Sequence, residues 1–165
     1  MCELDENKFE IILANYEDLS NLNFDCGDDD LNEFLLKDSF ENLKENLCTI
    51  FLCAYEEKII GFFSLSADSI EINEPLSIKY KYYPAIKIGR LGVQKEYQNN
   101  GVGSFLLKWI NGYCRDINKT IGVRFISVDA YNLEKPLKFY EKNNFIKLIM
   151  SEYNNTVPMY KDLNK

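Results

Sequence analysis

The sequence contains no histidine among its 165 residues. Histidine is the commonest general base near neutral pH and a frequent metal ligand. Proton transfer must therefore use carboxylates, tyrosine, cysteine or water, and we expect no metal site. The five cysteines are scattered and never form a C-x-x-C pair. That spacing favours free thiols over zinc ligands or disulfide bridges.

Long hydrophobic runs are also missing. No apolar stretch approaches the roughly 20 residues that cross a bilayer. The N-terminal segment Met1–Asn7 is acidic and polar, whereas a signal peptide is basic and then apolar. We therefore expect a cytoplasmic protein without a membrane interaction. The length fits a single domain over residues 1–165.

Positive charge is scarce: 19 Lys and Arg stand against 26 Asp and Glu, which gives a formal net charge of −7. This balance argues against a general nucleic-acid binder, because phosphate contacts require a basic surface. It is compatible with a cationic substrate that is attracted to the site electrostatically.

The hydrophobic pattern predicts an α+β domain in which helices flank a mixed sheet. Alternation and β-rich composition indicate strands, and 3.6-residue periodicity indicates helices. The predicted strands are 9–14, 48–55, 59–65, 86–93, 125–130, 145–150 and 157–160. The predicted helices begin at Asp28–Asp30 (to about Leu47), at Val102 and at Pro136 (to Asn143), and 71–85 is expected to be an irregular connection.

The most informative segment is the polar loop between the strand that ends at Val93 and the helix that begins at Val102. The unpaired N–H groups of a helix N-terminus suit a phosphate or pyrophosphate, and glycines such as Gly101 and Gly103 let the backbone approach the anion. The loop lacks the Lys-Ser/Thr ending of a Walker A site and the third glycine of a dinucleotide fingerprint. Taken alone, it is equally compatible with a tight turn into a packed helix.

Two motifs carry a family resemblance. Gln98-x-x-Gly101-x-Gly103, directly after Leu91-Gly92-Val93, resembles the acetyl-CoA motif of the GNAT superfamily of N-acetyltransferases. Downstream, Phe139–Phe145 resembles the family's Tyr-Glu-Lys-x-Gly-Phe segment, and Pro158–Leu163 resembles its last strand. The resemblance implies a GNAT-like fold with a mostly antiparallel mixed sheet, acetyl-CoA as co-substrate, and a cofactor-binding core over about 86–145.

The resemblance also implies roles for individual residues. Tyr140 corresponds to the family's general acid, and a phenol of pKa about 10 is protonated at neutral pH. Asn132 lies eight residues before Tyr140, where the family often has an Asn seven residues before that contacts the pantetheine arm. The main chain of Leu91, Gly92 and Val93 would pair with the acetyl and pantetheine groups. The backbone N–H groups of Gln98, Asn99, Asn100, Gly101, Val102, Gly103 and Ser104 would hold the pyrophosphate.

The sequence does not identify the general base. Asp68, Glu71 and Glu74 follow the third predicted strand and could line the acceptor cleft. Asp129 could serve as a base or pair with Arg90 or Arg124. For each carboxylate a solvated or ion-paired role is the competing interpretation, and no base is needed if the amine arrives neutral.

The sequence does not identify the acceptor of the acetyl group either. We expect a primary amine of a small molecule or peptide. Phe24–Gly27, Leu31–Leu35 and Ile60–Ser66 are similar to the toxin branch of the superfamily. That branch acetylates aminoacyl-tRNA and pairs with an antitoxin, which gives the first alternative; a local basic cluster could then serve the RNA (Lys79, Lys81, Lys87 and Arg90). The second alternative is a non-catalytic acyl-CoA-binding regulator. Whether a homodimer completes the cleft stays open as well.

Overall fold

The computed structural model describes residues 4–73, 76–150 and 152–165. Its strands form one seven-stranded sheet in the order β1-β2-β3-β4-β5-β7-β6. The β4–β5 pair is parallel, whereas β1–β2, β2–β3, β5–β7 and β6–β7 are antiparallel. The predicted α+β fold with a mixed, mostly antiparallel sheet is therefore confirmed. The strands are β1 (Phe9–Leu13), β2 (Thr49–Tyr55), β3 (Lys58–Ile70), β4 (Tyr83–Val93), β5 (Phe125–Tyr131), β6 (Ile146–Lys147) and β7 (Thr156–Asp162).

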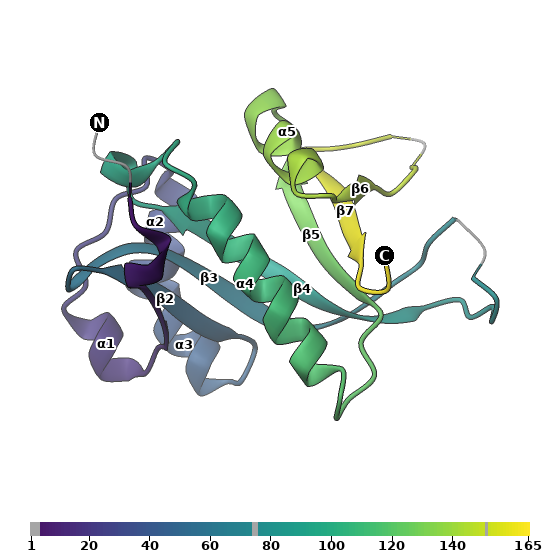
Figure 1. Cartoon of the computed structure of the whole chain (residues 1–165), viewed down its shortest axis with the longest axis horizontal. Helices are drawn as coiled ribbons and strands as arrows, with labels where there is room; N and C mark the ends of the chain where they lie inside the picture. The colour runs from purple at the N-terminus through teal and green to yellow at the C-terminus, as the bar shows by residue number, and fades with distance from the viewer. Residues whose placement is uncertain (1–3, 74–75, 151) are drawn as a thin grey trace. The chain divides into compact units, whose positions relative to one another are not determined.

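The helices lie between these strands in the chain (Figure 1). Three short helical turns accompany them, of which two are 3₁₀ (η1 and η3) and one is π-helical (η2). The helical elements are η1 (Glu6–Lys8), α1 (Tyr16–Ser20), α2 (Asp29–Glu33), η2 (Phe34–Asp38), α3 (Ser39–Lys44), η3 (Lys95–Tyr97), α4 (Val102–Ile117) and α5 (Glu134–Lys142).

The described residues group into two compact units. The first contains the chain up to Ser66 together with Gly89–Lys108, and the second contains Ala67–Ile88 together with Trp109–Lys165. The strands β3 and β4 and the helix α4 each contribute residues to both units. Each unit is described by itself below.

The core of the first unit lies between β2, β3 and the helical stretch α2–η2–α3. The Asp28 side chain caps this stretch by accepting the N–H of Leu31, as its position before an apolar helical pattern predicts. The π-helical turn was not predicted, and it places Phe34 and Leu35 in the core. These two side chains pack with a cluster that also contains Ala14, Leu19, Phe24, Cys26, Ile50, Leu52 and Phe62.

The second unit is built on β5, which pairs with β4 on one side and β7 on the other. Its parallel ladder with β4 joins Ala85–Ile88 to Phe125–Val128. The core cluster of this unit is rich in rings and contains Ile70, Tyr83, Ala85, Phe125 and Tyr160. Figure 1 shows α5 lying beside β5, and the two elements are in contact.

Several elements differ from the sequence-based expectation. The strand β4 begins at Tyr83, within the expected irregular connection 71–85, and the helix α5 begins at Glu134 instead of Pro136. The helix α1 was not predicted; it is five residues long, and the Asn15 and Asp18 side chains close a capping box at its start. The strand β3 continues to Ile70, so Asp68 lies within it and not after it. The strand expected over 145–150 is reduced to the two residues of β6.

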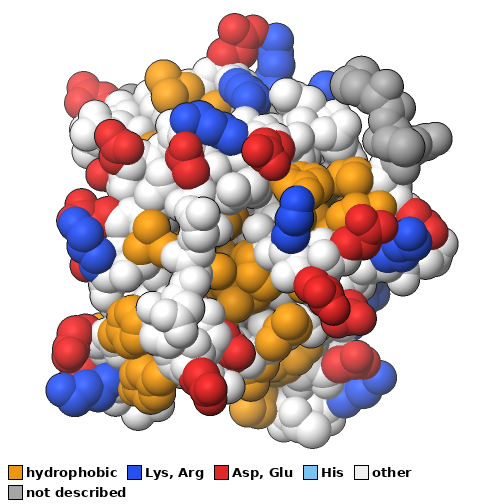
Figure 2. Space-filling model, turned by 90° about the vertical axis from the view of Figure 1, so that its left-hand side faces the viewer, with side chains coloured by type: hydrophobic (Ala, Val, Ile, Leu, Met, Phe, Trp, Pro, Cys, Tyr) orange, Lys and Arg blue, Asp and Glu red, His pale blue; other side chains and the backbone are white. Residues whose placement is uncertain are grey.

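The surface carries both signs of charge. Figure 2 shows acidic side chains interspersed with lysines and arginines on one face, along with hydrophobic side chains. Most of the ion pairs are exposed and contribute little to stability. Over the described residues, no helix is both long enough and apolar enough to span a membrane.

Candidate functional site

The end of β4 extends beyond its partner strand. The ladder with β5 stops at the pair Ile88–Val128, whereas β4 continues to Val93. The segment Leu91–Val93 is therefore outside that ladder among the described residues. Main-chain N–H and C=O groups at such a strand end can pair with an extended ligand that carries amides of its own.

Gly92 is required by packing in the first unit. A Cβ added to Gly92 would lie 2.6 Å from the Cε1 atom of Phe62, whose ring is fully buried. The Phe62 ring is in turn packed edge-on against Phe24 and stacked on Phe34. The glycine thus lets the strand lie directly on the aromatic core.

The loop from Gln94 to Gly101 turns the chain from β4 into the sixteen-residue helix α4. Two of its residues have left-handed backbone, Asn99 at φ +62° and Gly101 at φ +85°. Asparagine and glycine are the residues that adopt this conformation most readily. Space beside Gly101 is open, since the nearest atom to an added Cβ is Glu6 Oε1 at 4.0 Å. A bulky anion can therefore approach this backbone closely.

The helix α4 begins at this turn. The N–H of Phe105 donates to the Gly101 carbonyl at 3.0 Å, the i to i−4 bond of an α-helix. The N–H groups of Val102 and Gly103 precede it and belong to the first turn, where a helix has no partners for its own donors. Together with the helix dipole, these donors favour a phosphate or pyrophosphate. The residues present therefore fit the pyrophosphate of acetyl-CoA.

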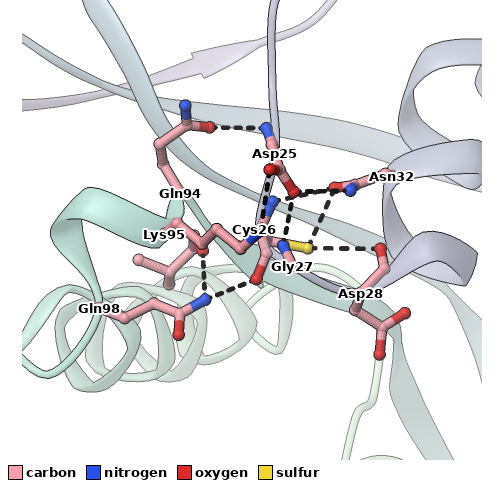
Figure 3. A network of polar contacts seen from close by, with 9 residues as sticks. Asp25, Cys26, Gly27, Asp28, Asn32, Gln94, Lys95 and Gln98 are labelled. Atoms are coloured by element: carbon pink, nitrogen blue, oxygen red, sulfur yellow. Dashed lines mark hydrogen bonds and ion pairs between the residues drawn. The ribbon is translucent and has the colours of Figure 1, made fainter.

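The side chain of Gln98 supports this loop from behind. Its Nε2 atom donates to the Cys26 carbonyl at 2.7 Å and to the Val93 carbonyl at 3.0 Å (Figure 3). Its own N–H bonds the Lys95 carbonyl at 3.3 Å, and the Asn100 side chain donates to the Gln98 carbonyl. Gln98 therefore ties the end of β4 to a second segment of the chain. Its side chain shapes the loop.

That second segment is centred on Asp25, as Figure 3 shows. The Asp25 N–H donates to Gln94 Oε1 at 2.9 Å, and its carbonyl accepts the Lys95 N–H at 2.9 Å. The Asp25 carboxylate accepts the Gly27 N–H and the Asn32 side chain and pairs with Lys95 Nζ at 3.1 Å. These contacts, led by the Gly27 N–H, lower the pKa of Asp25, so it stays ionised at neutral pH.

Sequence reasoning did not assign any role to this support. Asp25 and Asn32 lie outside the cofactor motif, and Asp25 contacts Gln94 of the loop across 69 residues of sequence. The signal in the sequence is the polar run Asp25-Cys26-Gly27 ahead of a capped helix, which is typical of a turn and does not identify the partner segment.

In the second unit, Tyr140 occupies the last turn of α5. The N–H of Phe145 bonds the Tyr140 carbonyl, and the N–H of Asn144 bonds the Glu141 carbonyl, both at 3.0 Å. Asn144 has φ +67°. This is the Schellman pattern, and its usual hydrophobic contact is present because the Phe145 and Tyr140 rings lie 5.4 Å apart. Asparagine thus replaces the family's glycine without loss of the helix stop.

Burial keeps the Tyr140 phenol neutral. The residue is 8% exposed and lies edge-on to the rings of Phe139 and Phe145. Removal from water disfavours the phenolate and raises the pKa of Tyr140 well above 10. The side chain can therefore donate a proton but does not lose one spontaneously at neutral pH.

Most of the other residues considered from sequence have structural partners. Asn132 donates through Nδ2 to the Asn154 carbonyl at 3.1 Å, and its N–H bonds the Asn155 carbonyl. Asp68 accepts the Ser127 hydroxyl at 2.5 Å. Asp129 pairs with Lys87 at 2.5 Å, so the suggested partners Arg90 and Arg124 were wrong. Arg124 pairs with Asp162, and Arg90 lies over the Phe34 ring. Glu71 is exposed, and Glu74 lies outside the described residues.

The cysteines Cys53 and Cys114 are buried. Burial raises the pKa of Cys53 and of Cys114 to about 12, so both remain thiols at neutral pH. Within the described residues, no group of three or more His, Cys, Asp and Glu side chains could hold a metal ion.

The predicted site residues divide between the two units. Leu91–Ser104 belong to the first unit, where the strand end, the loop and the start of α4 are contiguous. Tyr140 and Asn132 belong to the second. The motif turn is thus a strand–loop–helix with an open backbone, as its spacing predicts.

Comparison with known proteins finds toxin acetyltransferases among the relatives of this chain. The chain is 28% identical over 115 residues to a tRNA-acetylating toxin of Mycobacterium tuberculosis (strain ATCC 25618 / H37Rv), covering 67% of this chain and 69% of the relative. Among solved structures, AtaT complexed with acetyl-methionyl-tRNAfMet matches with a TM-score of 0.79 at 22% identity, over 91% of this chain and 93% of the other. A mutant AtaT toxin bound to the C-terminus of the antitoxin AtaR and acetyl-CoA matches with a TM-score of 0.76 at 19% identity, over 95% and 94%.

The sequence profile of the acetyltransferase (GNAT) domain matches residues 46–147, which is more than half of the chain and includes both motifs. The match agrees with the mixed sheet, the strand–loop–helix turn at Gly101 and the Tyr140 turn described above. The chain belongs to the GNAT family of acetyltransferases and is an N-acetyltransferase that uses acetyl-CoA as its acetyl donor.

Proposed function

We propose that this enzyme transfers the acetyl group to the α-amino group of aminoacyl-tRNA. The observation that carries the proposal is the 28% identity, over two thirds of the chain, to a tRNA-acetylating toxin. The fold shared with AtaT in complex with acetyl-methionyl-tRNAfMet is consistent with it. These relatives favour the aminoacyl-tRNA acceptor, the first alternative from the sequence, over the small-molecule or peptide amine that the sequence placed first.

The chain's own contribution to donor binding is made by main-chain groups. We assign the pyrophosphate to the N–H groups at the start of α4, from Gly101 to Ser104, and to the turn Gln98–Asn100 that precedes them. We assign the pantetheine amides to the main chain of Leu91–Val93. When bound, acetyl-CoA supplies a thioester carbonyl that an amine attacks, with the CoA thiol as leaving group.

Tyr140 is the proton donor in this proposal. Leaving-group departure requires a proton at sulfur, and general acid catalysis of this kind contributes about 10²- to 10⁴-fold. Burial keeps Tyr140 Oη protonated until the proton is transferred to the leaving sulfur. The Schellman turn and the Phe145 ring fix the position of the phenol.

No carboxylate is assigned as the base. Asp68 is hydrogen-bonded to Ser127 and Asp129 is ion-paired with Lys87, so both have structural partners. An α-amino group has a pKa of about 7.7 to 8.0, so a substantial fraction is neutral at physiological pH. We therefore propose that the amine enters in its neutral form, after losing its proton to water. Attack makes the nitrogen cationic, and water also takes the proton released as the amide forms, while Tyr140 protonates the leaving sulfur and regains a proton from solvent.

The test is a competition among acceptors with radiolabelled acetyl-CoA. Aminoacyl-tRNAs, the same tRNAs without the amino acid, polyamines and short peptides are incubated with the wild-type enzyme. We expect label in aminoacyl-tRNA alone, released by mild alkali as an N-acetylamino acid. A higher kcat/KM for a polyamine or a peptide would reject the proposal and restore the small-amine acceptor.

We also propose that an antitoxin partner regulates this activity. AtaT is described in complex with the C-terminus of the antitoxin AtaR, and the present chain shares its fold. Expression of the enzyme alone is then expected to arrest growth, and the Tyr140→Phe variant is expected to be harmless. Normal growth with fully active, soluble wild-type enzyme would contradict the toxin assignment.

A further inference from the structure

The segment before β4 exposes an unusual run of side chains. Lys79, Tyr80, Lys81 and Tyr82 alternate a cation with a phenol, and we call these four residues the Lys-Tyr strip. Tyr80 is 66% exposed and Tyr82 is 54% exposed, although tyrosine is usually at least half buried. Both lysines are also exposed. Two large rings in solvent, two residues apart in sequence, indicate a contact surface.

The strip is fixed in place by a buried tyrosine. Tyr83 Oη accepts the Tyr80 N–H at 3.1 Å and donates to the Ile78 carbonyl at 3.0 Å. The Tyr83 ring is 7% exposed and lies edge-on to Phe125 in the core of the second unit. The Tyr80 ring packs edge-on against Tyr83, with centroids 6.2 Å apart. The exposed Tyr80 ring is therefore fixed to the core of the second unit through Tyr83.

The segment that contains the strip is positively charged, whereas the chain as a whole is negatively charged. Residues 76–95 contain five Lys and Arg and no Asp or Glu, while the whole chain has a net charge of −7. Two of these cations are engaged elsewhere, since Lys87 pairs with Asp129 and Lys95 with Asp25. Within the described part of the chain, Lys79 and Lys81 form no ion pair. Lys81 Nζ instead lies 5.2 Å from the centroid of the Tyr82 ring.

Aromatic rings interleaved with cations are suited to one class of ligand. Unpaired bases stack on tyrosine rings, and lysines placed between the rings contact the phosphates that join those bases. A double-stranded stem cannot stack in this way because its bases are already paired. The aminoacyl end of tRNA is single-stranded.

We propose that the Lys-Tyr strip binds the single-stranded aminoacyl end of tRNA, with bases stacked on Tyr80 and Tyr82 and phosphates held by Lys79 and Lys81. This inference rests on the proposed function for its choice of RNA. It adds a specific contact with tRNA to that function. The contact is basic and aromatic although the enzyme is acidic overall, and its residues are separate in sequence from the acetyl-CoA motif.

The experiment compares three double variants with the wild type. Tyr80→Ala/Tyr82→Ala removes the rings, and Tyr80→Phe/Tyr82→Phe keeps the rings but removes the hydroxyls. Lys79→Gln/Lys81→Gln removes the charges, with Lys44→Gln/Lys58→Gln as a control that changes the net charge equally at exposed positions. KM and kcat are measured for aminoacyl-tRNA and for acetyl-CoA, and melting by circular dichroism verifies folding.

Stacking on one ring contributes about 1 to 3 kcal/mol, which corresponds to about 5- to 150-fold in affinity. We expect the Ala pair to raise the KM for aminoacyl-tRNA by at least 10-fold with kcat and the KM for acetyl-CoA unchanged. The Phe pair should behave as the wild type. The Gln pair at 79 and 81 should reduce the slope of log affinity against log salt by about 1.4, because each single-strand phosphate contact contributes about 0.7.

An unchanged KM for aminoacyl-tRNA in the folded Ala pair would overturn the proposal. The proposal would also be overturned if the Ala pair changed the oligomeric state in sedimentation while it still bound RNA normally. That result would assign the strip to a protein–protein interface. If the wild type acetylates no aminoacyl-tRNA, the proposed function fails separately. The strip is then judged by direct binding of a single-stranded oligoribonucleotide, and equal affinity of wild type and Ala pair rejects it.

Discussion

At the scale of single residues, the buried phenol of Tyr140 determines which part of the pH profile it can control. Its pKa is raised above 10 by loss of hydration, so the protonated, donating form persists to high pH. The α-amino acceptor gains its reactive neutral form as the pH rises through about 8. We expect kcat/KM to rise through about pH 8, to reach a plateau near pH 9 and to stay level up to pH 10. A fall between pH 8 and 10 would indicate a donor with a lower pKa than Tyr140.

The Tyr140→Phe variant tests the same residue by removal of one oxygen. The Phe ring preserves the edge-on packing with Phe139 and Phe145, so the fold should be maintained. We expect kcat to fall by about 10²- to 10⁴-fold, the usual contribution of a general acid. The KM for acetyl-CoA should change little. Turnover equal to the wild type would remove Tyr140 from the mechanism.

Gly92 offers a prediction about packing. In Gly92→Ala the new methyl group would start 2.6 Å from Phe62 Cε1, and the buried Phe62 ring has little room to move. Overpacking of this kind costs about 1 to 3 kcal/mol of unfolding free energy. The matched control is Gly112→Ala on α4, where an added Cβ meets nothing within 4 Å. That variant should gain about 0.5 to 1 kcal/mol from helix propensity. Urea denaturation measures both, and equal stabilities would contradict the packing argument.

At the scale of elements, the support behind the anion loop can be tested through Gln98. Gln98→Ala removes two hydrogen bonds, to the Cys26 and Val93 carbonyls, of which each contributes about 1 kcal/mol. We expect weaker acetyl-CoA binding in calorimetry and faster amide exchange over the turn Gln94–Gly101. The control Asn42→Ala removes an exposed side-chain bond to the Asp38 carbonyl on α3 and should not affect acetyl-CoA. An unchanged amide exchange rate in Gln98→Ala would mean that the turn keeps its conformation without the Gln98 side-chain hydrogen bonds.

The elements also show what could be predicted from the sequence. The strand–loop–helix around Gly101 and the stop at Asn144 followed from local rules, since backbone with positive φ favours Gly and Asn. The π-helical turn at Phe34 was missed because its extra residue still fits a helical pattern of apolar positions. The Asp25–Gln94 contact was missed because it joins segments 69 residues apart, and hydrogen-bond partners at that separation leave no periodic signal. Tyr140 was found by its motif, and its burial became visible only in the fold.

At the scale of the whole molecule, the net charge of −7 predicts an unusual response to salt. A tRNA-binding protein with a broad basic face releases many counterions, and its log affinity falls steeply with log salt. Here the proposed phosphate contacts come mainly from Lys79 and Lys81, and screening of the protein's own negative charge works in the opposite direction. With two or three phosphate contacts at about 0.7 to 0.9 each, we expect a slope shallower than about −3 for aminoacyl-tRNA. Filter binding between 50 and 200 mM salt measures it. A slope steeper than about −5 would require a large basic surface that this acidic chain has little means to build, and would point to a partner that supplies the missing charge.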